Sequence, residues 1–179
     1  MVRIDDIDLS NPNKETITAL LQLMYTGKGV NETIIQRLGS LDPGTIDPLL
    51  EDLSKDNDPD LRYLAVEAAF GLHGEGAAPA VLRLLQDDFV GNRSAACRFI
   101  IEMNNPKYLP FLVGRLREDT EGPVRYIAAT GLGEIGDMTC LDALRYAAEH
   151  DRGTDHEGRE IKTKAEESIQ EIEARLGGG

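Results

Sequence analysis

Three acid–base pairs recur along this sequence with the same spacing. Each consists of an aspartate and an arginine six residues later: Asp56 and Arg62, Asp87 and Arg93, Asp119 and Arg125. A carboxylate beside a guanidinium could serve in catalysis. A catalytic site would occur once and depart from the repeat, however, whereas these pairs occur at the same place in every central unit. We therefore predict a structural ladder, in which each aspartate accepts hydrogen bonds from an arginine of its own or the adjacent unit.

A glycine-rich stretch, "GPVRYIAATGLGEIGD" at 122–137, raises the possibility of nucleotide binding. Gly131, Gly133 and Gly136 nearly form a GxGxxG motif, which holds a phosphate when it joins a strand to the N-terminus of a helix. Here the first two glycines fall inside a helical pattern, and Gly136 falls just past its end, where a C-cap glycine belongs. We predict that they let neighbouring helices approach closely.

Metal ligands gather in one segment. His150, Asp151, Asp155, His156 and Glu157 are suitable ligand types within a short span, but their spacing is not that of one helix face. We predict a solvated polar loop, with no metal and no other cofactor, and we keep a loop metal site as the alternative.

The two cysteines do not form a reactive pair. Cys97 and Cys140 lie far apart and outside any CxxC motif, so neither a disulfide framework nor a zinc site is indicated. Cys97 shares a column of the repeat with apolar residues, which predicts a buried thiol. We expect no nucleophilic catalysis and predict that the protein is not an enzyme.

Composition indicates one all-α domain. The chain has 179 residues, 41% of them hydrophobic and only 5% aromatic, with no Trp. Abundant Ala, Leu and Ile favour closely packed helices over a sheet core. The length is near that of one domain, so we predict a single repeat domain over residues 1–179.

The charge balance restricts the partners. The chain contains 32 acidic and 19 basic side chains, a formal net charge of -13, which repels nucleic acid and anionic membranes and favours a basic protein partner. The start, "MVRIDDIDLSNP", has acids where a signal peptide needs basic residues, and no apolar run approaches the roughly 18 residues of a membrane span. We expect a soluble, cytoplasmic protein.

An internal repeat of about 31 residues organises residues 31–150. Pro48, Pro79 and Pro110 lie 31 residues apart, and Asp142 takes the equivalent place 32 residues later. Each unit reads as a helix, a short turn and a second helix. We predict about four such helical hairpins stacked as a right-handed α-α superhelix, because helices of about 10 residues are too short to be stable alone.

The two ends of the chain should cap this stack. Residues 1–30 contain an amphipathic helix, for which we predict Asn11 as the cap and Pro12 in the first turn. Residues 151–176 read as a divergent C-terminal cap, and residues 177–179 as a flexible tail. Terminal copies of a solenoid are expected to be atypical, since they face solvent on one side.

The segment "VRYIAATGLGEIGD", with "LRYLAVEAAFGLHG" as a weaker copy, resembles the short HEAT-like repeats of the phycobilin lyase type. This resemblance covers residues 31–150 and implies antiparallel helix pairs in a curved solenoid whose second helices line the concave face. The family includes lyase-type chaperones for bilin attachment, scaffolds and a hydroxylase. Related hydroxylases use several His-Glu dipeptides around iron, whereas only His156-Glu157 occurs here.

The resemblance implies that polar residues of the second helices lie on the concave face, where a partner could bind. The predicted binding residues are Asp52, Arg83, Gln86, Arg115, Arg117, Arg145, Tyr146 and Glu149, with Asp47 and Glu51 beside them. Arginine and tyrosine are enriched at interface hot spots, so we predict a protein-binding scaffold or adaptor; the alternative for these residues is a solvated face. Two other functions stay open: a lyase-like chaperone for a tetrapyrrole or client protein, and an immunity-type inhibitor of a basic toxin.

Overall fold

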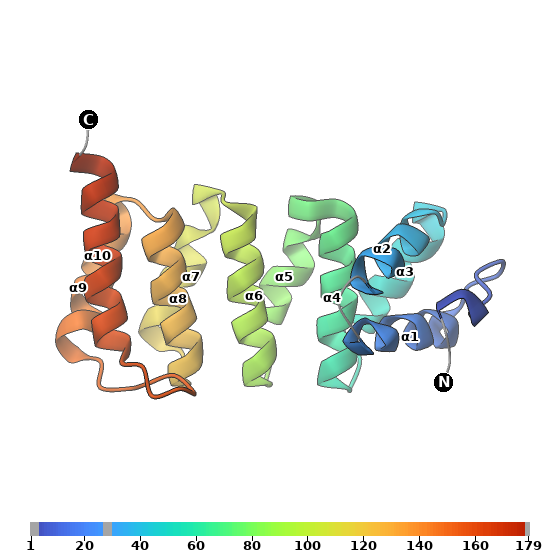
Figure 1. Cartoon of the computed structure of the whole chain (residues 1–179), viewed down its shortest axis with the longest axis horizontal. Coiled ribbons are helices and arrows are strands. Elements are labelled where there is room, and N and C mark those ends of the chain that lie inside the picture. Colours follow the sequence, from blue (N-terminus) through green and yellow to red (C-terminus); the bar gives the residue numbers. More distant parts are fainter. Residues whose placement is uncertain (1–3, 27–29, 178–179) are drawn as a thin grey trace. The chain divides into compact units, whose positions relative to one another are not determined.

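The computed structural model describes residues 4–26 and 30–177, which form α-helices joined by turns and short 3-10 helices (Figure 1). The α-helices are α1 (Lys14–Gln22), α2 (Val30–Gly39), α3 (Pro43–Leu53), α4 (Pro59–His73), α5 (Ala78–Leu84), α6 (Val90–Met103), α7 (Leu109–Glu118), α8 (Gly122–Ile135), α9 (Leu141–His150) and α10 (Ile161–Gly177). Apart from one isolated β-bridge between Thr154 and Glu160, no strand pairing occurs in the described part. The predicted all-α class is confirmed.

The chain divides into two compact units, Met1–Asn92 (unit 1) and Arg93–Gly179 (unit 2). The predicted repeats at 31–150 correspond to the helices α2 to α9, which follow one another as hairpins. Residues 1–92 contain 16 acidic and 7 basic side chains, a formal charge of -9, whereas residues 93–179 contain 16 and 12, a charge of -4. Most of the net negative charge therefore belongs to unit 1.

Proline and capping residues set where the helices begin. Pro59 is the first residue of α4, and the Asp58 carboxylate accepts a hydrogen bond from the Asp60 N–H at 2.9 Å. A proline is tolerated there because the first N–H groups of a helix have no intrahelical acceptor. The predicted cap of α1 is corrected: Asn13 caps this helix and accepts from the Thr16 N–H, because the helix begins at Lys14, two residues beyond Pro12.

In unit 1, α4 is the central element and packs against α1, α2, α3 and α5 (Figure 1). Its Leu64 and Ala65 lie in the core with Ile17 of α1, Ile34 of α2 and Leu50 of α3, all of them almost fully buried. Burial of such side chains supplies stability that helices of this length lack on their own.

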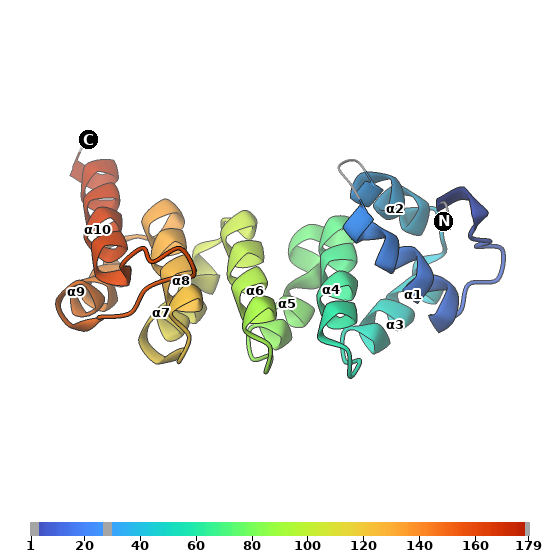
Figure 2. The ribbon, with the colours of Figure 1, turned by 60° about the horizontal axis from the view of Figure 1, so that its bottom comes forward.

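In unit 2, α7 packs on α8 and α9, and α10 covers α8 and α9 (Figure 2). One face of α10 buries Ile161, Ala165 and Ile172, while Glu166 and Glu173 on other faces are exposed. This polar outer side is what a terminal cap requires. Of the predicted tail, Gly177 is the last residue of α10, and residues 178–179 lie outside the described residues.

Within the described residues, the helices are too short or too polar for any of them to cross a lipid bilayer.

Candidate functional site

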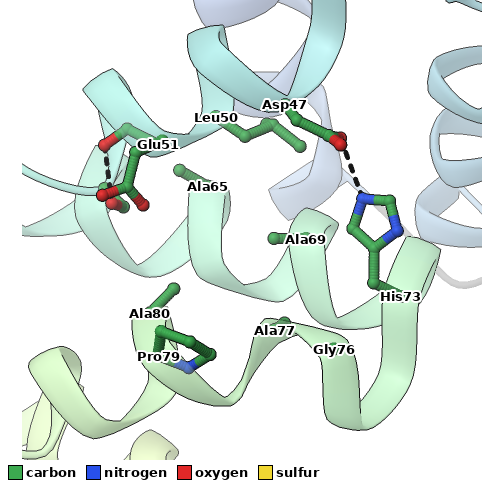
Figure 3. A pocket seen from close by; sticks show the side chains of 11 residues that line it. Asp47, Leu50, Glu51, Ala65, Ala69, His73, Gly76, Ala77, Pro79 and Ala80 are labelled. Atoms are coloured by element: carbon green, nitrogen blue, oxygen red, sulfur yellow. Dashed lines mark hydrogen bonds and ion pairs between the residues drawn. The ribbon is translucent and has the colours of Figure 1, made fainter. Parts of the chain in front are cut away.

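A pocket of about 230 Å³ lies in unit 1 where α3, α4 and α5 meet (Figure 3). Its apolar part is formed by Leu50 of α3, Ala65 and Ala69 of α4, Ala77, and Ala80 of α5. Ala65 and Ala69 are one helical turn apart and so share a face of α4, where their small side chains leave the space open. We call this site the alanine pocket.

Polar side chains border the alanine pocket on the α3 side. The Asp47 carboxylate lies 2.9 Å from Nε2 of His73, at the C-terminal end of α4 (Figure 3). Both side chains are substantially exposed. A carboxylate and an imidazole at the mouth of an apolar pocket can orient a cationic or hydrogen-bonding group while the apolar floor receives a hydrocarbon chain.

Glu51 forms the second acidic position of this border. Its carboxylate receives Lys55 Nζ at 2.7 Å and Arg83 Nη2 at 2.6 Å, and Arg83 also donates to the Ser54 hydroxyl at 3.0 Å. The Lys55 hydrogen bond is the main cause of a lowered pKa of Glu51, opposed by burial and assisted by Arg83. Arg83, predicted as a binding residue, is thus partly engaged by Glu51.

The predicted ladder residues join each repeat to the next one. In unit 1, Arg62 donates from Nε and Nη2 to both oxygens of Asp87, at 2.7 and 2.6 Å, and from Nη1 to the backbone carbonyl of Asp56 at 2.9 Å. Burial raises the pKa of Asp87, but the Arg62 guanidinium and the Phe89 N–H outweigh it and bring the pKa to about 2. Asp87 is therefore held as a carboxylate and is a poor general base.

Unit 2 repeats this arrangement and corrects the role predicted for Arg115. Arg93 donates to both oxygens of Asp119, at 2.8 and 3.0 Å. Arg115, predicted to face a partner, instead donates to the same carboxylate at 3.3 Å, and only 16% of its side chain is exposed. Asp119 is buried, and its carboxylate depends on guanidinium donors in place of water. Burial raises the pKa of Asp119, but Arg93 and Arg115 outweigh this effect, so the pKa is lowered.

The last rung uses an aspartate that the sequence reasoning missed. Arg125 donates to both oxygens of Asp151 at 2.7 and 3.1 Å and to the carbonyl of Asp119 at 2.9 Å. Asp151 lies 32 residues after Asp119 and also accepts the N–H of the second residue after it, Gly153. The column spacing could have identified Asp151, which the sequence reasoning assigned to the polar loop.

The first aspartate of the ladder is satisfied by a lysine. Position 31, where the preceding arginine would lie, holds Asn31, whose side chain bonds to Glu67 instead. Lys14 of α1 donates to Asp56 at 3.0 Å and to Asp52 at 2.9 Å. Asp52, predicted as a binding residue, is thus paired with the N-terminal helix, although its side chain stays largely exposed.

The remaining predicted binding residues lie in both units. Gln86 of unit 1 is exposed beside a shallow depression at Arg62 and Arg83. In unit 2, Arg145 makes a 3.4 Å ion pair with Glu173 of α10, and Glu149 is exposed. The other two line a second depression: Arg117 and Tyr146.

Backbone carbonyl groups of the glycine-rich stretch accept hydrogen bonds from an arginine side chain of the same chain. Arg175 of α10 donates to the carbonyls of Gly133, Glu134 and Gly136, at 3.0, 2.9 and 2.6 Å. Gly131 and Gly133 lie inside α8, and a side chain at Gly131 would overlap Ile101. A phosphate needs N–H donors, so this segment is built for helix packing, and sequence reasoning missed Arg175.

Asp155, in the 150–157 segment, has partners within the chain. Asp155 accepts hydrogen bonds from the Arg159 side chain and from the N–H groups of Glu157 and Arg159. Among the residues with described positions, no group of three or more His, Cys, Asp or Glu side chains could hold a metal ion. Cys97 is buried, and burial raises the pKa of its thiol to about 12, which disfavours the reactive thiolate.

Helix pairs that recur along the chain, joined by a repeated arginine-to-aspartate rung, define a helical repeat protein. Residues 46–132 match the family described as HEAT repeats. Over these residues the chain resembles HEAT repeats, which confirms the resemblance noted in the sequence.

Two further comparisons place the chain among known proteins. It is 32% identical over 118 residues to the "Phycobilisome maturation protein" of Synechococcus elongatus. The match covers 63% of this chain and 56% of that relative, so the chain spans little more than half the length of the relative it matches. A crystal structure of an engineered protein has a similar fold, with a TM-score of 0.51 and 17% identity, over 96% of this chain and 87% of that one.

Proposed function

We propose that this protein is a non-catalytic scaffold that binds a segment of another protein in the alanine pocket. The observation that carries the proposal is the combination of an apolar floor with the exposed carboxylate of Asp47 at the border. Glu51, the other acid of the border, is already bound by Lys55 and Arg83. An aliphatic side chain of the partner would enter the pocket, and a neighbouring lysine or arginine would meet the border. HEAT repeats support a scaffold role, since stacked helix pairs offer extended surfaces.

Charge supports a basic partner segment. Unit 1 carries a formal charge of -9, and such a field raises the association rate of cationic segments. The absence of catalysis is part of the proposal. It is supported by the low pKa of Asp87 and the raised pKa of the Cys97 thiol, because these groups are held in unreactive states.

A selection from a random peptide library, with the full chain as bait, tests this function. We expect enrichment of peptides in which a leucine, isoleucine or valine is flanked by lysine or arginine. Titration of one selected peptide against Ala69→Leu, which fills the pocket, should show about tenfold weaker binding, the effect of losing one well-packed side chain.

Asp47→Asn should weaken the same peptide by a smaller factor, about threefold, because one exposed charge is lost. Asp60→Asn is the matched control, since Asp60 is an exposed acid of α4 that does not line the pocket. Equal binding by wild type and Ala69→Leu, with both proteins folded, would reject the alanine pocket as the site.

The maturation protein of Synechococcus elongatus favours a second candidate, a chaperone-like subunit that handles a client during assembly. The family resemblance adds that the client or its cofactor could be a tetrapyrrole. Addition of a free bilin to the full chain should then change the bilin absorbance spectrum, and an unchanged spectrum at saturating protein would exclude pigment handling while leaving the peptide result unaffected.

A further inference from the structure

A second depression, in unit 2, has a different chemical character from the alanine pocket. Its volume is about 330 Å³, and it is bordered by α7, α9 and the start of the connection to α10. Its lining includes Leu116, Arg117, Ala143, Tyr146, His150 and Arg152. We call it the unit 2 hollow.

Two aromatic rings form a flat surface at the unit 2 hollow. Tyr146 and His150 are one turn apart on α9, and their rings stack with centroids 4.4 Å apart and planes inclined by 17°. Nδ1 of His150 lies 3.1 Å from the Tyr146 carbonyl, which fixes the imidazole in this position. The tyrosine side is open to solvent, as 59% of Tyr146 is exposed. Tyrosine is enriched at protein interfaces relative to the rest of the surface, and this stacked pair offers a flat face to a partner.

Arginine is in excess around these rings. Arg117, Arg125 and Arg152 line the hollow, against two lining carboxylates, Asp119 and Asp151. Both carboxylates are already bound by guanidinium groups of the ladder, as described above. The charged lining residues are therefore three arginines against two aspartates, an excess of one positive charge in a chain whose formal net charge is -13. The exposed Glu149 carboxylate lies 3.9 Å from Nδ1 of His150 at the same place.

Arg152 and Arg117 differ in their hydrogen bonds to the rest of the protein. Arg152 donates to the carbonyls of Glu149 and Asp151, at 2.8 and 3.1 Å, which fixes its guanidinium at the edge of the hollow. Arg117 is exposed and makes no hydrogen bond or ion pair with any residue in the described ranges. Its planar donor group is thus available for a carboxylate, which a guanidinium can bind through two parallel hydrogen bonds.

We propose that the unit 2 hollow binds an acidic segment of a partner protein. An aspartate or glutamate of that segment pairs with Arg117, and an adjacent aromatic or aliphatic side chain lies on Tyr146 and over the apolar floor of Leu116 and Ala143. Charge complementarity selects this occupant, because a basic segment would meet the excess of arginine. The proposal does not depend on the alanine pocket, which we expect to take segments of opposite charge.

The test uses two defined peptides and the isotope-labelled full chain. Acetyl-Gly-Asp-Asp-Trp-Asp-Asp-Gly-amide should shift the NMR signals of the Tyr146 ring, the His150 ring and the Arg117 side chain in a saturable way. The analogue with lysine in place of each aspartate should leave these signals unchanged. The methyl signals of Ala69 and Ala77 report on the alanine pocket, so the two proposals can fail separately.

Variants locate the contacts. Arg117→Gln should weaken the acidic peptide about three- to tenfold, and Tyr146→Ser by a similar factor, since each removes one exposed contact. Arg98→Gln is the matched control: Arg98 is an exposed arginine of α6 in unit 2 that does not line the hollow. Thermal melting verifies that each variant is folded.

Three results would overturn the proposal. The first is equal perturbation by the lysine peptide, and the second is unchanged affinity in Arg117→Gln. The third is displacement of the acidic peptide by a single-stranded oligonucleotide at a lower concentration than by unlabelled peptide. The hollow would then bind phosphate groups in preference to carboxylates.

Discussion

The buried carboxylate of Asp119 shows how a single residue can organise a repeat. Only 1% of its side chain is exposed, and it accepts hydrogen bonds from Arg93, Arg115 and the Glu121 N–H. Burial of a charge is costly unless every oxygen is paired. The stability of the repeat therefore depends on the arginines that neutralise this group.

Arg93→Ala should lower the free energy of unfolding by about 2–4 kcal/mol, because it leaves the buried carboxylate with only the longer Arg115 contact and the Glu121 N–H. Urea denaturation followed by circular dichroism measures the change. Arg98→Ala is the control, since Arg98 lies five residues later on α6 and is exposed, and a change within about 0.5 kcal/mol is expected for it. Equal stability of wild type and Arg93→Ala would show that the rung is not structural.

Acid should weaken the ladder in a definite pH range. Burial raises the pKa of Asp87, but Arg62 and the Phe89 N–H bring it to about 2, below the 3.8 of an unperturbed aspartate. A carboxyl group with a lowered folded-state pKa stabilises the protein above its unfolded pKa, and this stabilisation is lost as the pH falls through the folded value. The free energy of unfolding should thus fall between about pH 4 and pH 2.

Urea denaturation at stepwise pH measures this loss, and Asp87→Asn provides the comparison. The variant lacks the titrating group, so its stability should be lower at neutral pH and should decline less over the acid range. A decline as steep as that of the wild type would assign the acid sensitivity to other carboxylates.

At the scale of elements, the helices and their periodicity could be predicted from sequence, because the columns of Ala, Leu, Pro and Arg follow one spacing. The direction of individual side chains could not. Arg115 and Arg117 are two residues apart on α7, yet the first turns to Asp119 and the second to solvent. Residues two apart lie on different faces of a helix, and the following turn decides which face meets Asp119, here that of Arg115.

The contacts of Asp151 and Arg175 were not predicted either, and each case has its own structural reason. The longer connection before α10 hid Asp151 as a ladder residue, since the turn that usually follows such an aspartate is replaced by a loop closed by Asp155 and Arg159. Arg175 lies 39 residues from Gly136, and no repeat column contains it. Contacts made once, by the end of the chain, leave no periodic signal.

The packing role of Gly131 yields a prediction with a close control. Alanine is the better helix former by about 1 kcal/mol, but a side chain at Gly131 would overlap Ile101 and crowd Leu112. Gly131→Ala should therefore lower the melting temperature, because α6, α7 and α8 cannot keep their spacing in unit 2.

Gly114 lies inside α7 with open space where a side chain would be added. Gly114→Ala should raise the free energy of unfolding by about 0.5–1 kcal/mol. Differential scanning calorimetry on both variants compares the two positions directly. If both substitutions changed the stability in the same direction and by similar amounts, helix propensity alone would account for them, and no packing constraint would exist at Gly131.

At the scale of the whole molecule, charge is distributed unevenly along the chain, with -9 in residues 1–92 and -4 in residues 93–179. Salt screens such fields over about 8 Å at physiological ionic strength. Association of a basic peptide with the alanine pocket should therefore slow as salt rises from 50 to 500 mM, with a smaller change in the dissociation rate. Stopped-flow fluorescence separates the two rates, and a salt-independent association rate would contradict electrostatic attraction by unit 1.

The rungs of the ladder connect residues that are only 25 or 26 positions apart in the chain. Closing loops of that length costs little chain entropy, and proteins whose native contacts are local fold in milliseconds or faster. The Arg62–Asp87 rung needs no residue beyond position 87, so it can close without the residues that form the Arg93–Asp119 rung. The order of the repeats along the sequence can then become an order in time as the chain leaves the ribosome.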